Sequence, residues 1–361
     1  MPPHNGGIER VAASLVEGLG HRGHDVRWIS SATPTRAGEE HSLVRVPAWN
    51  VLEEKLGVPY PLWSAAAVAT LGHEIERADV VHVHDCLYMG SAAAAAWCRR
   101  FGRPLLVTQH VGYVPFGPAL DFVQRTAYLT LGTAVLSSAD RLVACSAHVP
   151  EYFATLGFRG AFRVIPNAID DTRFHRVDVE GRRAARLAWG VPVDARVALF
   201  VGRLVPKKAI DRVIAAQRVL AREGVTLLVV GDGPLASLLT NAPATIHHPS
   251  VPAERMPELY AAADAFVLPS RGEGLPLSVQ EALMCGLPVV VSDDPSYTQN
   301  LAGTTGVGFA STDRALVDAT RSAVLEARDA AAISACARDR WGGDGFITAY
   351  EAILAELVRS A

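Results

Sequence analysis

Two glutamates separated by seven residues are the strongest candidates for chemistry in this sequence. Glu273 and Glu281 bound the segment Glu-Gly-Leu-Pro-Leu-Ser-Val-Gln-Glu. A carboxylate accepts hydrogen bonds in pairs and a vicinal diol donates in pairs, so such residues are suited to bind a ribose or a hexose. Taken singly, each has a simpler explanation, Glu273 as a cap-region acid and Glu281 as an exposed helix acid.

Two cations form the second candidate group. Arg203 and Lys208 follow the apolar run 197–201. Arginine offers a bidentate fork and lysine a compact charge, so together they can hold a pyrophosphate and neutralise it as a leaving group. The chain has only three lysines, Lys55, Lys207 and Lys208. This scarcity favours a specific role, although a solvated surface cluster is the alternative and a shared role for Lys207 stays open.

The elements that must position these residues are short β-branched runs alternating with longer helical segments. The predicted strands are 79–83, 105–108, 141–145, 197–201, 226–230, 265–268 and 288–292. This alternation predicts an α/β fold of βαβ units with parallel sheets. Ligands bind at the carboxyl ends of such strands, where helix N-termini offer free N–H groups to phosphate.

Proline and glycine residues, which mark helix ends, refine the expected positions of the two glutamates. Glu273 lies in the loop after the strand 265–268, and Glu281 lies on a helix that Pro276 opens and that ends at Gly286. Near the end of the chain, apolar residues at helical spacing predict an amphipathic helix over 347–358.

Length and composition bound the class of protein. A chain of 361 residues predicts two domains, and 50% hydrophobic with 20% charged residues predicts a folded protein. The net charge of -3 gives no general attraction to nucleic acid. The five cysteines form no C-x-x-C pair, so neither a zinc site nor a disulfide framework is indicated, and a cytoplasmic location is expected. No apolar run reaches the roughly 20 residues of a membrane span.

The segment from Glu273 to Glu281 resembles the signature of retaining glycosyltransferase family 4. Gly202-Arg203-Leu204 with Lys208 is similar to the diphosphate loop of that family, and the turn 230–234 to its next strand-end turn. The resemblance implies the GT-B fold, two Rossmann-like domains facing a cleft, with the C-terminal helix crossing back to the N-terminal domain. The expected parts are an acceptor-binding domain over 1–170, a nucleotide-sugar-binding domain over 171–340 and a crossover helix over 341–361.

The resemblance also implies roles for individual residues. The expected catalytic residues are Glu273, which binds the transferred sugar, Arg203 and Lys208, which bind the diphosphate, and His110, which touches the donor sugar. The expected donor-binding residues are Glu281, which binds the ribose, with Gly274, Leu275, Pro276, Leu277, Gly6, Gly7 and Val251. Ala209 stands where the family usually has glycine. His82, His84 and Asp85 form no recognisable metal set and are expected to line the cleft.

The activity that the resemblance implies is that of a retaining, metal-independent hexosyltransferase. The donor would be a nucleotide-diphosphate sugar, with no separate cofactor, and the acceptor a hydroxyl of a glycan, a lipid-linked glycan or a small molecule. Nucleic acid is not an expected partner. Two alternatives remain, a nucleotide-sugar epimerase of the same fold and a non-catalytic sugar-nucleotide-binding protein.

Two further features concern the N-terminal half. The stretches 49–63 and 113–128 are rich in aromatic and apolar residues, which admits a lipid-linked acceptor or a peripheral contact with the inner membrane face, although core packing is the more ordinary explanation. Asn5-Gly6-Gly7 is typical of a strand-to-helix loop, so we expect that the first strand is missing and that translation starts upstream. This expectation keeps the non-catalytic alternative open.

Overall fold

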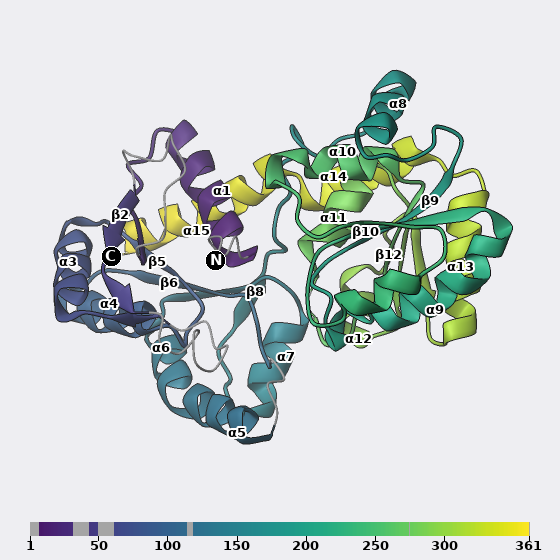
Figure 1. Ribbon diagram of the computed structural model, residues 1–361. Helices are drawn as coiled ribbons and strands as arrows, with labels where there is room; N and C mark the ends of the chain where they lie inside the picture. The colour runs from purple at the N-terminus through teal and green to yellow at the C-terminus, as the bar shows by residue number, and fades with distance from the viewer. Residues whose placement is uncertain (1–6, 32–42, 50–60, 114–117, 274, 361) are drawn as a thin grey trace. The chain divides into compact units, whose positions relative to one another are not determined.

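The computed structural model describes residues 7–31, 43–49, 61–113, 118–273 and 275–360 (Figure 1). The chain divides into two compact units. Unit 1 comprises residues 1–167 and 344–361, and unit 2 comprises residues 168–343. Within the described ranges, no helix has the length and apolar character that crossing a bilayer requires.

Unit 1 is built on a sheet of four parallel strands in the order β5-β6-β7-β8. These strands are β5 (Val81–His84), β6 (Leu105–Gln109), β7 (Arg141–Ala144) and β8 (Phe162–Val164). Four shorter strands form two further pairs, one parallel, β1 (Trp28–Ser31) with β2 (Leu43–Val46), and one antiparallel, β3 (Ala48–Trp49) with β4 (Leu62–Trp63). Every residue of β6 is buried, as expected for a strand covered on both faces.

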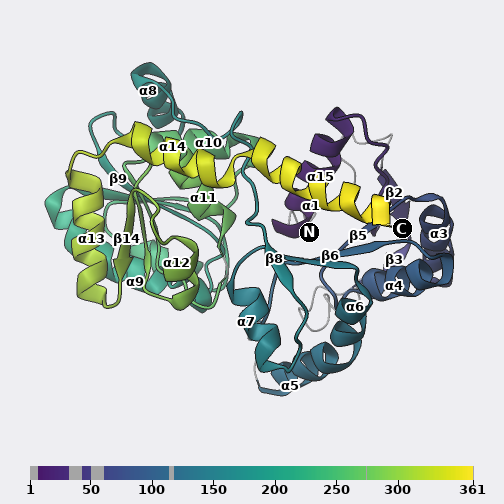
Figure 2. The ribbon, with the colours of Figure 1, turned by 180° about the vertical axis from the view of Figure 1, so that it is seen from behind.

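Helices cover both faces of this sheet. They are α1 (Gly7–His21), α3 (Ala65–Arg77), α4 (Met89–Phe101), α5 (Pro118–Ala127), the π-helical segment η1 (Tyr128–Gly132), α6 (Thr133–Ser138), α7 (His148–Thr155) and α15 (Gly343–Ser360). Figures 1 and 2 show α1 and α15 on one side of the sheet and α5, α6 and α7 on the other. The chain therefore returns to unit 1 with its last helix.

The last helix confirms the amphipathic pattern predicted over 347–358. Its inner face buries five residues against unit 1, namely Phe346, Ile347, Tyr350, Ile353 and Leu357. The Tyr350 hydroxyl lies 3.1 Å from Thr108 Oγ1 on the central strand β6. The same face makes a close contact with α1, where a Cβ added at Gly18 would lie 2.5 Å from Ile347 Cδ1.

Unit 2 is a doubly wound parallel sheet of six strands in the order β11-β10-β9-β12-β13-β14. The strands are β9 (Arg196–Val201), β10 (Val225–Val230), β11 (Thr245–His248), β12 (Ala265–Leu268), β13 (Val289–Ser292) and β14 (Val307–Ala310). From β9 the chain winds outward through β10 and β11, and from β12 it winds the other way. The winding therefore reverses between β9 and β12.

The helices of unit 2 pack on both faces of its sheet, α9 with α13 and α11 with α14. They are α8 (Val179–Ala188), α9 (Ile210–Leu220), α10 (Met256–Ala262), α11 (Leu277–Met284), α12 (Pro295–Asn300), α13 (Asp313–Leu325) and α14 (Ala330–Trp341). Short 3-10 turns lie between them, η2 (Pro206–Lys208), η3 (Ala221–Glu223), η4 (Ala236–Asn241) and η5 (Ala253–Arg255).

All seven predicted strands are present, with ends shifted by at most two residues. The helix predicted to open at Pro276 begins one residue later, and Pro276 is its N-cap with φ -61° and ψ 135°. Gly286, just past the end of that helix, has φ 82°, a left-handed conformation that glycine adopts without steric cost.

Candidate functional site

Two loops of unit 2 leave the sheet at the point where its winding reverses. One follows β9 and carries Arg203 and Lys208, and the other follows β12 and carries Glu273. Because β9 and β12 are paired neighbours, with Ala198 opposite Ala265, their carboxyl ends lie at the same edge of the sheet. This edge is the expected ligand-binding position of an open parallel sheet.

An ion pair joins these two loops. Lys208 Nζ lies 2.7 Å from Glu273 Oε2, and the two side chains are only 20% and 11% exposed. The backbones also meet, since the Arg271 N–H donates to the Lys207 carbonyl oxygen at 3.3 Å. The explanation of the lysines as a solvated surface cluster is therefore wrong for Lys208. Burial lowers the pKa of the neighbouring Lys207.

Glu281 lies on α11, which packs into the core of unit 2. The residue is 2% exposed, and the Tyr260 hydroxyl donates to its Oε2 at 2.7 Å. The simpler explanation of Glu281 as an exposed helix acid is therefore wrong. Burial of a carboxyl group is costly unless the group is hydrogen-bonded, and the Tyr260 hydroxyl supplies such a bond to Glu281.

Glycines shape the loop that carries Arg203. Gly231 has φ 134°, and a Cβ there would lie 2.0 Å from the carbonyl oxygen of Gly202. The Leu204 N–H donates to the Asp232 carbonyl oxygen at 2.9 Å. The turn after β10 thus holds the Arg203 loop by close backbone contact. Arg203 itself is exposed, and its side chain has no hydrogen bond or ion pair with the part of the chain that the structure describes.

Ala209 closes this loop and caps α9. Its backbone is left-handed, with φ 54° and ψ 40°, and its N–H donates to the Pro206 carbonyl oxygen at 2.9 Å. The glycine expected at this position would take that conformation without a Cβ penalty. The alanine keeps the loop closed and leaves the neighbouring Lys208 paired with Glu273.

Two residues that support the Glu273 loop, Asp294 and Tyr297, were missed by sequence reasoning. The Gly272 N–H donates to Asp294 Oδ2 at 3.1 Å, and Ser270 Oγ lies 2.5 Å from the Tyr297 hydroxyl. Burial, together with the negative charge of Glu273, raises the pKa of Tyr297. Asp294-Pro295 directly after the predicted strand 288–292 is a helix-start signal that could have located this support.

His110 belongs to unit 1, in a buried cluster at the carboxyl ends of β5 and β6. Its Nε2 lies 2.8 Å from His84 Nδ1, and its backbone N–H donates to Asp85 Oδ1 at 2.8 Å. Burial lowers the pKa of His84 to about 4 and lowers that of His110, so both imidazoles are neutral near pH 7. Burial raises the pKa of Asp85 to about 7.

His82, the other histidine of β5, was expected to line the cleft together with His84 and Asp85. His82 Nε2 lies 2.8 Å from Thr108 Oγ1, so it is bonded to the sheet. Across the described ranges, no three His, Cys, Asp or Glu side chains are arranged to hold a metal ion.

The remaining predicted contacts lie in several places. Gly6 and Gly274 lie outside the described residues. Gly7 is the first residue of α1, and Leu277 is the first residue of α11. Leu275, Leu277 and Val251 are partly buried and pack against the core of unit 2. The structure therefore brings together Lys208 and Glu273 most directly, with Glu281 on the helix that follows.

Comparison with known proteins adds to this geometry. Residues 5–173 match the family model described as Glycosyltransferase Family 4, and residues 182–340 match Glycosyl transferases group 1. The chain is 33% identical over 324 residues to a D-inositol 3-phosphate glycosyltransferase of Geodermatophilus obscurus, covering 80% of this chain and 70% of that protein. It is 28% identical over 379 residues to a GDP-mannose-dependent alpha-(1-6)-phosphatidylinositol monomannoside mannosyltransferase of Mycolicibacterium smegmatis, covering 96% and 92%.

Solved structures share the fold at lower identity. Anabaena Alr3699/HepE in complex with UDP has a TM-score of 0.75 at 18% identity, covering 98% of this chain and 97% of that one. Sucrose-phosphate synthase from Thermosynechococcus elongatus has a TM-score of 0.77 at 21% identity, covering 99% and 94%.

Proposed function

Because the chain belongs to glycosyltransferase family 4 and has the GT-B fold, we propose that it transfers a hexose from a nucleoside-diphosphate sugar to an acceptor hydroxyl with retention of configuration. The observation that carries this proposal is the Lys208–Glu273 pair at 2.7 Å, at the edge where the sheet of unit 2 reverses its winding. A cation for phosphate and a carboxylate for hydroxyl groups are in contact there.

Each part of the donor has a chemical match among the residues at this edge. The diphosphate suits Lys208, the exposed Arg203 and the N-terminus of α11, where free N–H groups attract anions. The ribose diol suits the buried carboxylate of Glu281, and the hydroxyls of the transferred sugar suit Glu273. On donor binding, Lys208 exchanges its carboxylate partner for a phosphate oxygen, and Glu273 accepts from the sugar.

The proposed reaction needs one bond broken and one bond formed at the anomeric carbon. The bond from that carbon to the diphosphate oxygen breaks, and a bond to the acceptor oxygen forms on the same face of the sugar. The acceptor proton moves to the departing phosphate oxygen. Orientation of the two substrates and stabilisation of the developing diphosphate charge by Arg203 and Lys208 would supply most of the rate enhancement. We propose no metal ion for this step.

The names of the relatives support a class of substrates. One is a GDP-mannose-dependent mannosyltransferase, and another is an inositol phosphate glycosyltransferase. The solved neighbours include one that holds UDP and glucose. We therefore propose a hexose-type donor and a hydroxyl-rich acceptor that is a glycan, a lipid-linked glycan or a small polyol.

The first test is nucleotide binding, measured by thermal shift and calorimetry over a panel of nucleoside diphosphates and their sugars. Glu281→Ala should weaken binding by about 10- to 100-fold, as loss of hydrogen bonds to a charged group predicts. Lys208→Ala should mainly lower kcat. Glu180→Ala, at an exposed helix glutamate of the same unit, is the matched control and should change neither quantity. Unchanged nucleotide affinity in Glu281→Ala would remove the ribose assignment.

The same protein separates the two alternative functions. Incubation with the donor alone would yield an isomerised sugar if the protein were an epimerase. Donor binding without turnover on any acceptor of a hydroxyl panel would instead favour a non-catalytic binding protein. Transfer to an acceptor, with the product's anomeric configuration read by NMR, decides retention.

A further inference from the structure

One side of unit 1 carries a continuous helical stretch that exposes several large apolar side chains. It runs through α5, η1 and α6, residues 118–138. Its exposed apolar side chains are Phe122 at 72%, Val123 at 60%, Leu129 at 45% and Leu131 at 41% exposure. Exposed apolar residues scattered singly are ordinary, whereas four within ten residues of one helical stretch mark an interaction surface.

The threonines of this stretch add to its apolar character. Thr126 Oγ1 donates to the Phe122 carbonyl oxygen at 2.9 Å, and Thr130 Oγ1 donates to the Thr126 carbonyl oxygen at 2.8 Å. Thr133 Oγ1 donates to the Tyr128 carbonyl oxygen at 2.8 Å. Because their hydrogens are used within the helix, these hydroxyls lose little on leaving water.

An open groove of about 790 Å³ continues this face. Leu129 and Thr133 line its near side, and the groove runs on to the start of β7 and the loop before β8. Its apolar wall includes Leu142, Leu156 and Phe158, and two arginines, Arg141 and Arg159, stand in its lining.

Charge on this surface is positive, although the whole chain carries a net charge of -3. Arg125 on α5, Arg159 and Arg163 are exposed. The neighbouring acids are engaged. Asp121 accepts from the Tyr113 hydroxyl at 2.6 Å, Asp140 accepts from the Leu105 N–H at 2.8 Å, and Glu356 pairs with Arg141.

The geometry points to an anionic lipid bilayer as the partner of this surface, which we define as Phe122, Val123, Arg125, Leu129 and Arg159. Phe122, Arg125 and Leu129 lie three and four residues apart, so the arginine stands beside the apolar ridge, as in helices that lie in a membrane interface. The apolar side chains would enter the headgroup boundary, and the arginines would contact lipid phosphates. A second copy of the chain fits less well, because a two-fold contact would bring Arg125 toward its own counterpart.

Vesicle flotation without any nucleotide tests this proposal, which does not depend on the donor-site assignment. The wild-type chain should bind vesicles of phosphatidylcholine and phosphatidylglycerol mixed at about 2:1, and should lose binding in high salt or on phosphatidylcholine alone. Phe122→Glu/Val123→Glu should lower the partition coefficient at least about tenfold. Arg125→Ser/Arg159→Ser should lower it about 25-fold on the anionic vesicles, about fivefold for each arginine.

Val219→Glu/Leu238→Glu is the matched control, because these two apolar residues of unit 2 are 41% and 42% exposed. It should bind vesicles as the wild type does, and thermal unfolding of every variant should match the wild type. Failure of the wild type to bind anionic vesicles, or an equal loss in the control, would overturn the proposal. So would a concentration-dependent dimer that Phe122→Glu/Val123→Glu converts to monomer while vesicle binding is unchanged. The surface variants should keep the nucleotide affinity of the wild type. The vesicle measurement and the nucleotide measurement therefore test the lipid surface and the donor site independently.

Discussion

Ala209 has a left-handed backbone conformation that its Cβ atom disfavours. It holds φ 54° and ψ 40°, a conformation that costs an alanine about 1–2 kcal/mol and a glycine little. Ala209→Gly should therefore stabilise the folded protein. Because glycine also gives the unfolded chain more conformational entropy, this gain is reduced by up to about 1 kcal/mol. We expect a net gain of about 0.5–1 kcal/mol in urea denaturation.

A matched control for Ala209→Gly is Ala221→Gly, because Ala221 is right-handed with φ -59° and ψ -32°. There the glycine relieves no strain and should destabilise by up to about 1 kcal/mol. Equal losses at the two positions would mean that the left-handed backbone of Ala209 carries no strain.

Asp85 is a second residue with an unfavourable environment, because its carboxyl group is buried. It is 5% exposed, and burial raises its pKa from the ordinary value of 3.8 to about 7. A carboxyl with a raised folded pKa contributes stability that is present below pH 3.8 and is lost as pH rises through about 7. Asp85→Asn should remove this loss, because asparagine stays neutral, can accept from the His110 N–H and tolerates the left-handed φ of 61°.

Denaturation at pH 8 and pH 5 checks this expectation. At pH 8 the variant should be more stable than the wild type by about 2–4 kcal/mol, and at pH 5 by clearly less. The buried histidines cancel in the comparison, because both proteins contain them. Asp140→Asn is the control, since its exposed carboxylate also accepts a backbone N–H, from Leu105. A pH-independent difference for Asp85→Asn would show that Asp85 is ionised in the folded state at both pH values.

The residue types of the candidate site were predictable, but their partners were not. Spacing and strand ends located Arg203, Lys208 and Glu273, because ligands of an open parallel sheet bind outside the carboxyl ends of its strands, at the point where the winding reverses. The Tyr260 hydroxyl on Glu281 and the Asp294 carboxylate under Gly272 come from other elements, 21 and 22 residues away. Such pairings depend on tertiary packing, which one-dimensional spacing does not encode.

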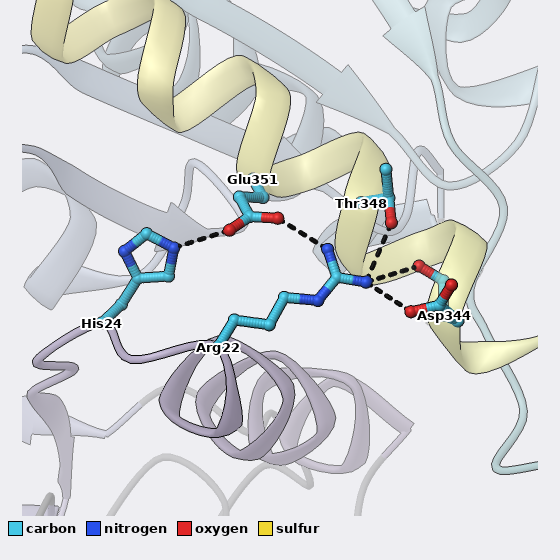
Figure 3. Close-up of polar contacts among 5 residues, drawn as sticks. All are labelled: Arg22, His24, Asp344, Thr348 and Glu351. Atoms are coloured by element: carbon cyan, nitrogen blue, oxygen red, sulfur yellow. Dashed lines mark hydrogen bonds and ion pairs between the residues drawn. The ribbon is translucent and has the colours of Figure 1, made fainter.

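At the scale of elements, a polar network fastens α15 to the end of α1 (Figure 3). Arg22 donates to Glu351 Oε2 at 2.6 Å and to Thr348 Oγ1 at 2.9 Å, and it pairs with Asp344. His24 Nε2 lies 2.8 Å from Glu351 Oε1. Two residues that follow α1 thus bind three side chains on one side of α15.

Arg22→Ala should loosen α15 and lower the unfolding temperature of unit 1 by a few degrees near neutral pH. The hydrogen bonds of His24 and then Arg22 lower the pKa of Glu351 from its ordinary value of 4.5. The contribution of Glu351 is therefore present above pH 4.5 and is lost as pH falls through its lower folded pKa. The difference between the variant and the wild type should shrink as pH falls below 4.5.

Calorimetry over that pH range measures this difference. Arg27→Ala, which removes an exposed pair with Asp25 at 3.8 Å, is the control and should have little effect at any pH. A difference between Arg22→Ala and the wild type that stays constant down to the acid limit would show that Glu351 does not carry the attachment.

Central elements were predicted better than edge elements, for a physical reason. The strands β6, β9 and β12 are covered on both faces and are mostly apolar, with only Thr108, Gln109 and Arg196 as polar residues. Three of the four edge strands of the two large sheets, β8, β11 and β14, bury few of their residues, as in Thr-Ile-His-His of β11, and were not predicted. The fourth, β5, has no fully buried residue either, but its alternating Val-His-Val-His was recognised. A strand that pairs on one side only needs less apolar sequence, so its pattern is weaker.

At the scale of the molecule, the chain builds two units with separate hydrophobic cores. The side chains proposed to bind the nucleotide, those of Arg203, Lys208 and Glu281, belong to unit 2, whereas His110 and the proposed lipid surface belong to unit 1. A ligand stabilises a unit only against an unfolding reaction that destroys the binding site. The two units should therefore respond differently to a nucleotide.

Hydrogen exchange in the presence of the tightest-binding nucleoside diphosphate tests this difference. At a concentration of about 100 times Kd, unit 2 gains about 2.7 kcal/mol, so amides of β9 that exchange through its unfolding should slow about 100-fold. Amides of β6 in unit 1 should keep their rates, because no proposed nucleotide contact unfolds with that strand. In Glu281→Ala at the same nucleotide concentration the protection of β9 should fall to a few-fold. Equal protection of β6 and β9 would mean that the nucleotide stabilises both units together, and an unprotected β9 would remove the donor site from unit 2.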